Sequence, residues 1–137
     1  MIAHKSSEDF DWVNAWAVCS SAKIFMQLFS GVKEDVERVN ALPPTEESPI
    51  RRRTFGADTN SSGKYFGAFE EGDVNALVEF SLCGDHIRIK TAKNAAPIEV
   101  RLALDNEGRC KLQMDGGEYL EQWQVRKIAL EGLFRGR

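Results

Sequence analysis

Residues 78–90, VEFSLCGDHIRIK, contain a β-hairpin whose register follows from its side chains. A two-residue turn made by Gly84 and Asp85 would place apolar residues of the two strands opposite one another, because such a short loop fixes the pairing of its strands. The pairs are Leu82 with Ile87 and Phe80 with Ile89. Glu79 then faces Lys90 on the other side. The stretch therefore predicts an antiparallel sheet with one apolar face.

A second hairpin follows around DNEG, residues 105–108. A three-residue loop with Gly108 in the left-handed conformation again brings apolar residues together. The pairs are Val100 with Met114, Leu102 with Leu112 and Leu104 with Cys110. Both hairpins predict the same apolar face, which favours one continuous sheet.

The alternating pattern also extends upstream, through RRRTFGADTNSSGKYFG at residues 51–67. It predicts strands near 51–57 and 64–69, and the second of these is expected to turn at EEGD, residues 70–73. We therefore expect six antiparallel strands in a meander that ends near Met114.

Helical periodicity flanks the sheet on both sides. Apolar residues recur at steps of three and four over 22–42, which predicts a helix that Pro43 and Pro44 end. A shorter helix is expected over 9–18 and a third over 118–134. The expected fold is α+β, with two N-terminal helices, a six-stranded antiparallel meander and a C-terminal helix packed on the apolar face. The predicted core contains Phe25, Leu28, Phe29, Val32, Phe80, Leu82, Ile87, Ile89, Leu102, Leu104 and Leu112.

The C-terminal helix carries a second apolar stripe, formed by Val125, Ile128 and Ala129, roughly opposite the main one. A helix that is apolar on two sides usually has two neighbours. We expect this stripe either to pack inside the chain, which we favour, or to form the interface of a homodimer or with another protein.

Length and composition predict a single domain over residues 1–137, with 42% hydrophobic residues and a net charge of −3. The acidic balance argues against nucleic acid as a partner, and no apolar run is long enough to span a membrane. The three widely spaced cysteines argue against a disulfide framework and favour a reducing compartment. Since no secretory signal is recognised, we expect a cytoplasmic protein.

Arg51, Arg53 and Lys64 are the candidates for an anion site. The loop between them is not a phosphate-binding P-loop, because six residues separate Gly56 from Gly63 and strands flank both sides. Alternation places the side chains of neighbouring arginines on opposite faces of a strand, so they cannot form one clamp. We favour an edge strand protected by charge over an anion site.

Cys83 and His86 flank the predicted turn on one side of the sheet and have the spacing of half a metal site. A zinc site needs three or four ligands, and the sequence offers no others nearby. As a catalytic pair they lack a third group and an oxyanion element. We therefore predict no catalytic residue, no metal site and no cofactor.

Five aromatic residues are candidates for lining a pocket between sheet and helices: Trp12, Trp16, Phe66, Phe69 and Trp123. The order of elements is similar to that of helix-grip lipid-binding folds, which place a long C-terminal helix across a curved sheet, although their opening strand has no counterpart here.

We expect a small binding or protein-interaction domain without catalytic activity. The first alternative is a binder of an apolar or aromatic small molecule in that pocket, and the second is an enzyme acting on an anionic substrate, with His86 as acid or base.

Overall fold

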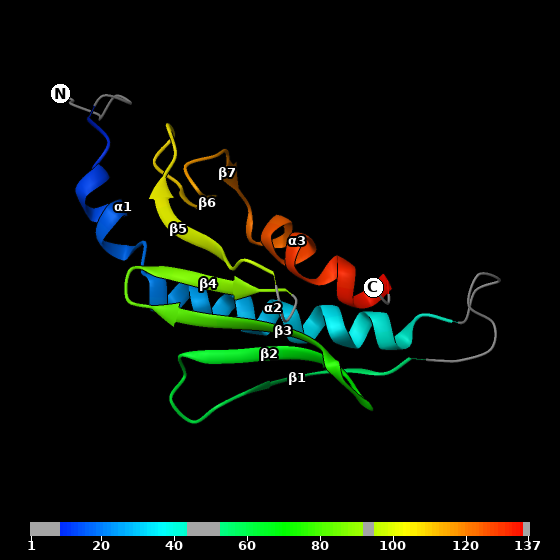
Figure 1. The fold of residues 1–137 in the computed structure, drawn as a ribbon. Helices are drawn as coiled ribbons and strands as arrows, with labels where there is room; N and C mark the ends of the chain where they lie inside the picture. Colours follow the sequence, from blue (N-terminus) through cyan, green and yellow to red (C-terminus); the bar gives the residue numbers. More distant parts are fainter. Residues whose placement is uncertain (1–8, 44–52, 92–94, 136–137) are drawn as a thin grey trace.

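The computed structural model describes residues 9–43, 53–91 and 95–135. Within them lie three helices and one antiparallel sheet (Figure 1). The elements are α1 (Trp12–Val18), α2 (Ser21–Ala41), β1 (Phe55–Thr59), β2 (Tyr65–Glu70), β3 (Asp73–Cys83), β4 (His86–Lys90), β5 (Ile98–Leu104), β6 (Cys110–Met114), β7 (Tyr119–Leu120) and α3 (Gln122–Arg135). The strands are hydrogen-bonded in sequence order from β1 to β7. The predicted α+β fold is confirmed, with seven strands rather than six.

Both predicted hairpins have the expected register. Leu82 lies opposite Ile87 across the β3–β4 turn, and Leu102 lies opposite Leu112 in the β5–β6 pair. Gly108 has the predicted positive φ, at 80°. Turn chemistry and side-chain pattern were therefore sufficient to fix the centre of the sheet.

The additional strand β7 shortens the last helix. Residues 118–121 were expected to open α3, but Tyr119 and Leu120 pair with β6, and the helix begins at Gln122. Leu120 lies opposite Leu112 and packs against the core. Pairing with an open sheet edge has therefore prevailed over local helical periodicity at this point.

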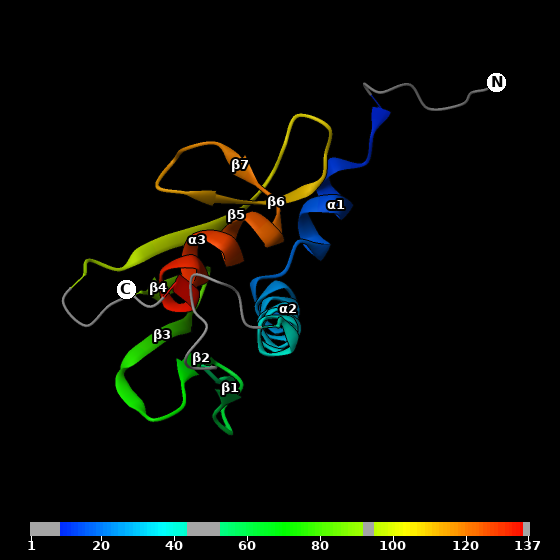
Figure 2. The same ribbon diagram turned by 90° about the vertical axis from the view of Figure 1, so that its right-hand side faces the viewer.

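The sheet curves around α2 and α3, from β1 and β2 at one end to β6 and β7 at the other (Figure 2). Helix α2 begins where the Ser20 side chain accepts a hydrogen bond from the backbone N–H of Lys23. Phe25 and Phe29 from this helix contact the ring of Phe66, which is stacked on Phe80 at a centroid distance of 4.4 Å. These aromatic rings join α2 to the middle of the sheet.

Most of the predicted core is buried, and four of its residues are only partly buried: Phe29, Leu82, Leu102 and Leu104. On α3, Val125 and Ala129 from the second predicted stripe are buried together with Leu130 and Leu133. Ile128 alone among the three stripe residues remains exposed. Two of the three residues of the second stripe therefore pack within the chain.

The edge strand β1 is tied to α2 by a side chain. The Asn40 amide nitrogen donates to the carbonyl oxygen of Phe55, and the backbone N–H of Phe55 donates to the Asn40 side-chain oxygen, both at 2.9 Å. The Asn40 side chain thereby satisfies both backbone polar groups of Phe55, as a neighbouring strand would. Asn40 therefore limits the number of unpaired backbone groups on an edge strand that was expected to be protected by charge.

The expectation that the cysteines form no disulfide is wrong. Cys19, between α1 and α2, is bonded to Cys110 at the start of β6, with their Cα atoms 5.5 Å apart, and Cys83 is a free thiol. Because disulfides persist mainly in oxidising compartments, the cysteine content no longer supports a cytoplasmic location. In the described part of the chain, no helix is both long and apolar enough to cross a membrane.

Candidate functional site

Helices α2 and α3 lie side by side and leave a groove of about 540 Å³ between their outward surfaces. The groove is lined by three kinds of side chain, namely cationic, acidic and apolar. They are Asp35, Arg38, Trp123, Arg126, Lys127, Leu130, Glu131, Phe134 and Arg135. We call this set the α2–α3 groove.

One side of the groove is built on a glycine. A Cβ atom at Gly31 of α2 would lie 2.6 Å from the Arg126 guanidinium, so the missing side chain allows Arg126 to lie across α2. There its Nε atom donates to Asp35 Oδ2 at 2.7 Å. Both charged side chains are largely shielded from solvent. This pair joins the two helices and fixes the wall of the groove.

The second side carries charge pairs along α3. Lys127 and Arg135 each contact Glu131, at 3.1 and 3.3 Å. The hydrogen bond from Lys127 lowers the pKa of Glu131 most, and Arg135 lowers it further. Arg38 makes no ion pair with any described residue. The groove therefore holds four cations against two carboxylates, an excess of two positive charges, and Arg38 is the cation without an ion-pair partner in the described chain.

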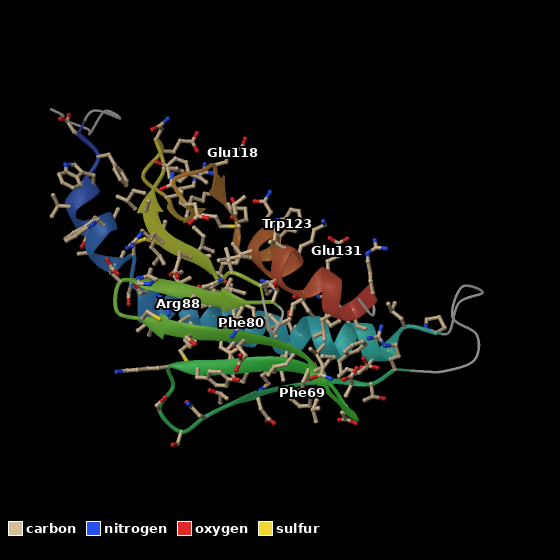
Figure 3. All side chains as sticks on the ribbon, viewed as in Figure 1. Phe69, Phe80, Arg88, Glu118, Trp123 and Glu131 are labelled. Carbon is tan, nitrogen blue, oxygen red and sulfur yellow. A yellow bond between two sulfur atoms is a disulfide. The ribbon has the colours of Figure 1, made fainter. Side chains whose placement is uncertain are left out.

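The apolar part of the groove combines a buried floor with an exposed aromatic ring. Leu130 is buried, Phe134 is half-buried, and the indole of Trp123 is 56% exposed. Trp123 lies near the start of α3 and Glu131 in its second half, so the indole and the charge cluster occupy different ends of the groove (Figure 3). A ligand spanning the groove would meet an aromatic surface and a cationic one.

The other predicted pocket residues do not meet. Trp12 and Trp16 are exposed on α1, Phe66 is fully buried in the core, and the Phe69 ring covers Gly56 on the face of the sheet away from the helices. Trp123 is the one member of the predicted set that lines the groove.

A separate hollow of about 350 Å³ does lie between α3 and β3. It has a different lining, including Ala76, Ile128 and Gly132.

The structure places the two described anion-binding candidates, Arg53 and Lys64, far apart. The Arg53 guanidinium forms a two-point contact with Glu70, at 2.9 and 2.6 Å, and also donates to the carbonyl oxygens of Leu133 and Phe134 at the end of α3. Lys64 lies at the opposite end of the β1–β2 hairpin, about 20 Å away at the usual rise per strand residue. Arg51 lies outside the described residues.

Cys83 and His86 are paired across the turn, as expected, on the sheet face away from the helices. His86 Nδ1 is hydrogen-bonded to Asp85 at 3.0 Å, which lowers the pKa of Asp85. His86 Nε2 lies 2.9 Å from Glu99 Oε1, without hydrogen-bond geometry. Because both ring nitrogens face carboxylates, neither is placed to take a proton from Cys83. No group of three or more metal-ligating side chains occurs among the described residues.

Helix α1 presents an unusual apolar surface. None of its residues is buried, and Trp12 and Trp16 are 61% and 63% exposed. The exposed apolar residues on and beside it are Phe10, Trp12, Val13, Trp16 and Val18, which we call the α1 surface.

The α2–α3 groove was missed in the sequence because its two walls are about 90 residues apart. A local signal was present in the spacing of Lys127, Glu131 and Arg135, which places one carboxylate four residues from each of two cations. That spacing identifies a charged helix face but cannot show that α2 lies beside it.

No protein-family model, curated protein or solved structure matches this chain.

Proposed function

We propose that this protein is a non-enzymatic binding domain that holds a small organic anion with an aromatic body in the α2–α3 groove. The observation that carries the proposal is a groove that combines the exposed indole of Trp123, an excess of cations and an apolar floor. An aromatic body would stack on the indole, and its acidic group would reach the cations.

Arg38 is the cation best suited to meet the acidic group. Arg126, Lys127 and Arg135 already have carboxylate partners, so a ligand would have to compete for them. Arg38 is exposed and has no such partner among the described residues. Its guanidinium can donate two parallel hydrogen bonds to a carboxylate or sulfonate.

Size and chemistry of the lining support binding rather than catalysis. A volume of about 540 Å³ suits a small molecule. The described lining includes no histidine, cysteine, serine or threonine that could act as a nucleophile or as a general base near neutral pH.

The proposal can be tested with naphthalene-2-sulfonate as the probe. In a Trp12→Phe/Trp16→Phe protein, Trp123 is the sole tryptophan, and its fluorescence should be quenched in a saturable way. Arg38→Glu should weaken binding about tenfold or more, because an attraction becomes a repulsion. Lys33→Glu is the matched control, since it makes the same charge change on the same helix but outside the groove lining.

A neutral naphthalene alcohol should bind much more weakly than the sulfonate. If the two probes bound with equal affinity, the proposal that the groove recognises an anionic group would be wrong. The absence of saturable quenching in the folded single-tryptophan protein would overturn it entirely.

A further inference from the structure

We propose that the α1 surface is an interface at which two copies of this chain pair with their α1 helices antiparallel. This inference goes beyond the α2–α3 groove and uses none of its residues.

The α1 surface is apolar and yet exposed to solvent. A helix of seven residues is too short to be stable by itself, and α1 has no buried residue to hold it on the protein. It nevertheless presents two indoles and three further apolar side chains to solvent within nine residues. Tryptophan is the residue type most enriched at the centres of protein interfaces. Burial in a partner would remove this apolar area from water.

Helix α1 is held in place before any partner arrives. Cys19 at its end is covalently bonded to Cys110, and the Asp11 side chain caps its start by accepting from Asn14. The ring of Phe10 lies over Gly108, where a Cβ atom would come within 2.2 Å of it. Figure 1 and Figure 2 both show α1 beside the β5–β6 hairpin. A fixed surface loses little conformational entropy on binding.

The charged residues on either side of the α1 surface favour a second copy of this chain as the partner. Residues 12–22 contain no charged side chain, whereas Asp9 and Asp11 precede them and Lys23 follows them. An antiparallel two-fold pairing of the α1 helices therefore brings the acidic start of each α1 toward the end of the other α1, where the chain continues into α2 and Lys23. Asp11 and Lys23 of different protomers then attract each other on both sides of the two-fold axis. Lys23 is exposed and has no ion-pair partner in the described part of the chain. By contrast, an anionic membrane would be repelled by the two aspartates beside the indoles.

The test is the mass of the protein in solution by light scattering over a concentration series. The wild-type chain should be a dimer that dissociates on dilution. Trp12→Ser/Trp16→Ser should raise the dimer dissociation constant about a hundredfold or more, since it removes two central aromatic side chains. Trp123→Ser is the matched control, because it removes an equally exposed indole from α3 and should leave the dimer unchanged. Lys23→Glu should weaken the dimer about tenfold at low salt and less at high salt.

A second measurement checks the orientation. A carbodiimide joins a carboxylate to an amine that lies beside it, so mixed ¹⁴N and ¹⁵N protein should give isotopically mixed peptides that link residues 9 or 11 to Lys23. A wild-type monomer at all concentrations would overturn the proposal, as would a dimer that Trp123→Ser disrupts or that the double α1 variant leaves intact. Retained binding of naphthalene-2-sulfonate by Trp12→Ser/Trp16→Ser would show that the variant is folded and keeps the two proposals separate.

Discussion

Arg53 is a single residue that joins three parts of the fold. It precedes β1, contacts Glu70 at the end of β2, and donates to the last carbonyl groups of α3. Its guanidinium also lies over the ring of Phe55, at 4.9 Å from the centroid. A cation at a helix C-terminus is favoured by the helix dipole. The residue that the sequence offered as an anion ligand therefore already has its charge engaged within the protein.

Arg53→Ala should lower the free energy of unfolding by about 2 kcal/mol or more, because several charge-assisted hydrogen bonds are lost at a partly buried position. Arg53→Lys should lose somewhat less, since it keeps the charge but not the two-point contact. Urea denaturation measures both. Arg109→Ala is the control: its pair with Glu107 is largely exposed and should contribute less than about 1 kcal/mol. Equal losses at the two sites would contradict this account.

Tyr65 should lose its proton at an unusually high pH. Burial of the phenol is the largest cause and its hydrogen bond to Glu79, at 2.9 Å, is the second; together they raise the pKa of Tyr65 to about 12. Because this pKa lies above the ordinary value of 10.0, the resulting stabilisation is fully present below pH 10 and is lost as the pH rises through about 12. In a Tyr119→Phe protein, which has Tyr65 as its sole tyrosine, ultraviolet absorbance should show a midpoint near 12. Glu79→Gln should lower the midpoint of the Tyr65 titration. A midpoint near 10 in the folded Tyr119→Phe protein would contradict the raised pKa of Tyr65.

At the level of elements, the hairpins could be predicted and the helix contacts could not. Leu82 and Ile87 are five residues apart, and a two-residue turn fixes their pairing through local geometry. The register of β6 with β7 depends instead on where the chain returns after Gly116 and Gly117, which made Tyr119 appear helical. The Asn40 contact with Phe55 spans a stretch that carries no pairing signal. Periodicity identifies which face of an element is apolar, but not which neighbour covers it.

Gly31 is the position where α2 and α3 constrain each other. Gly31→Ala should gain up to about 1 kcal/mol of helix stability, while the new Cβ atom displaces Arg126 from Asp35. We therefore expect a change in unfolding free energy within about 1 kcal/mol, together with several-fold weaker binding of naphthalene-2-sulfonate. Thermal unfolding and fluorescence titration measure the two effects.

Gly132→Ala is the matched control for this variant. A Cβ atom at Gly132 of α3 meets nothing within 4 Å, and this position is not part of the groove lining. The substitution should stabilise the helix by a similar amount and leave probe binding unchanged. If both variants behaved alike, the Arg126 position would not depend on Gly31.

For the whole molecule, the disulfide should contribute substantially to stability. It joins residues 91 apart in the sequence, and closing a loop of this length in the unfolded chain corresponds to about 4.6 kcal/mol. Cys19→Ser/Cys110→Ser should lower the free energy of unfolding by about 3 to 5 kcal/mol, and a reductant should do the same to the wild type. Cys83→Ser should change it far less, because that thiol has no bonded partner. Urea denaturation with and without reductant measures the contribution of the disulfide. A wild-type protein whose free energy of unfolding does not change with reductant would contradict this prediction.

The candidate site is a property of the whole molecule, which explains why the sequence indicated it so poorly. Trp123 was named as a pocket residue, but the pocket was expected between the sheet and the helices rather than on the outer side of the helix pair. Arg38 and Asp35 carried no signal, because charged residues on a helix usually face solvent. Cys19 and Cys110 lie in segments that only the folded chain brings together.

The bridge between Cys19 and Cys110 also turns the intervening backbone into a covalent ring with two tails. One tail carries α1, and the other carries the rest of β6, β7 and α3. A protease that cuts the ring once opens it without releasing either part, and the two pieces separate only after reduction. A cut in a tail leaves the fragment beyond it with no covalent link to the ring. The α1 surface and the α3 wall of the groove lie on these tails, so a single nick could sever either binding surface while leaving the ring closed.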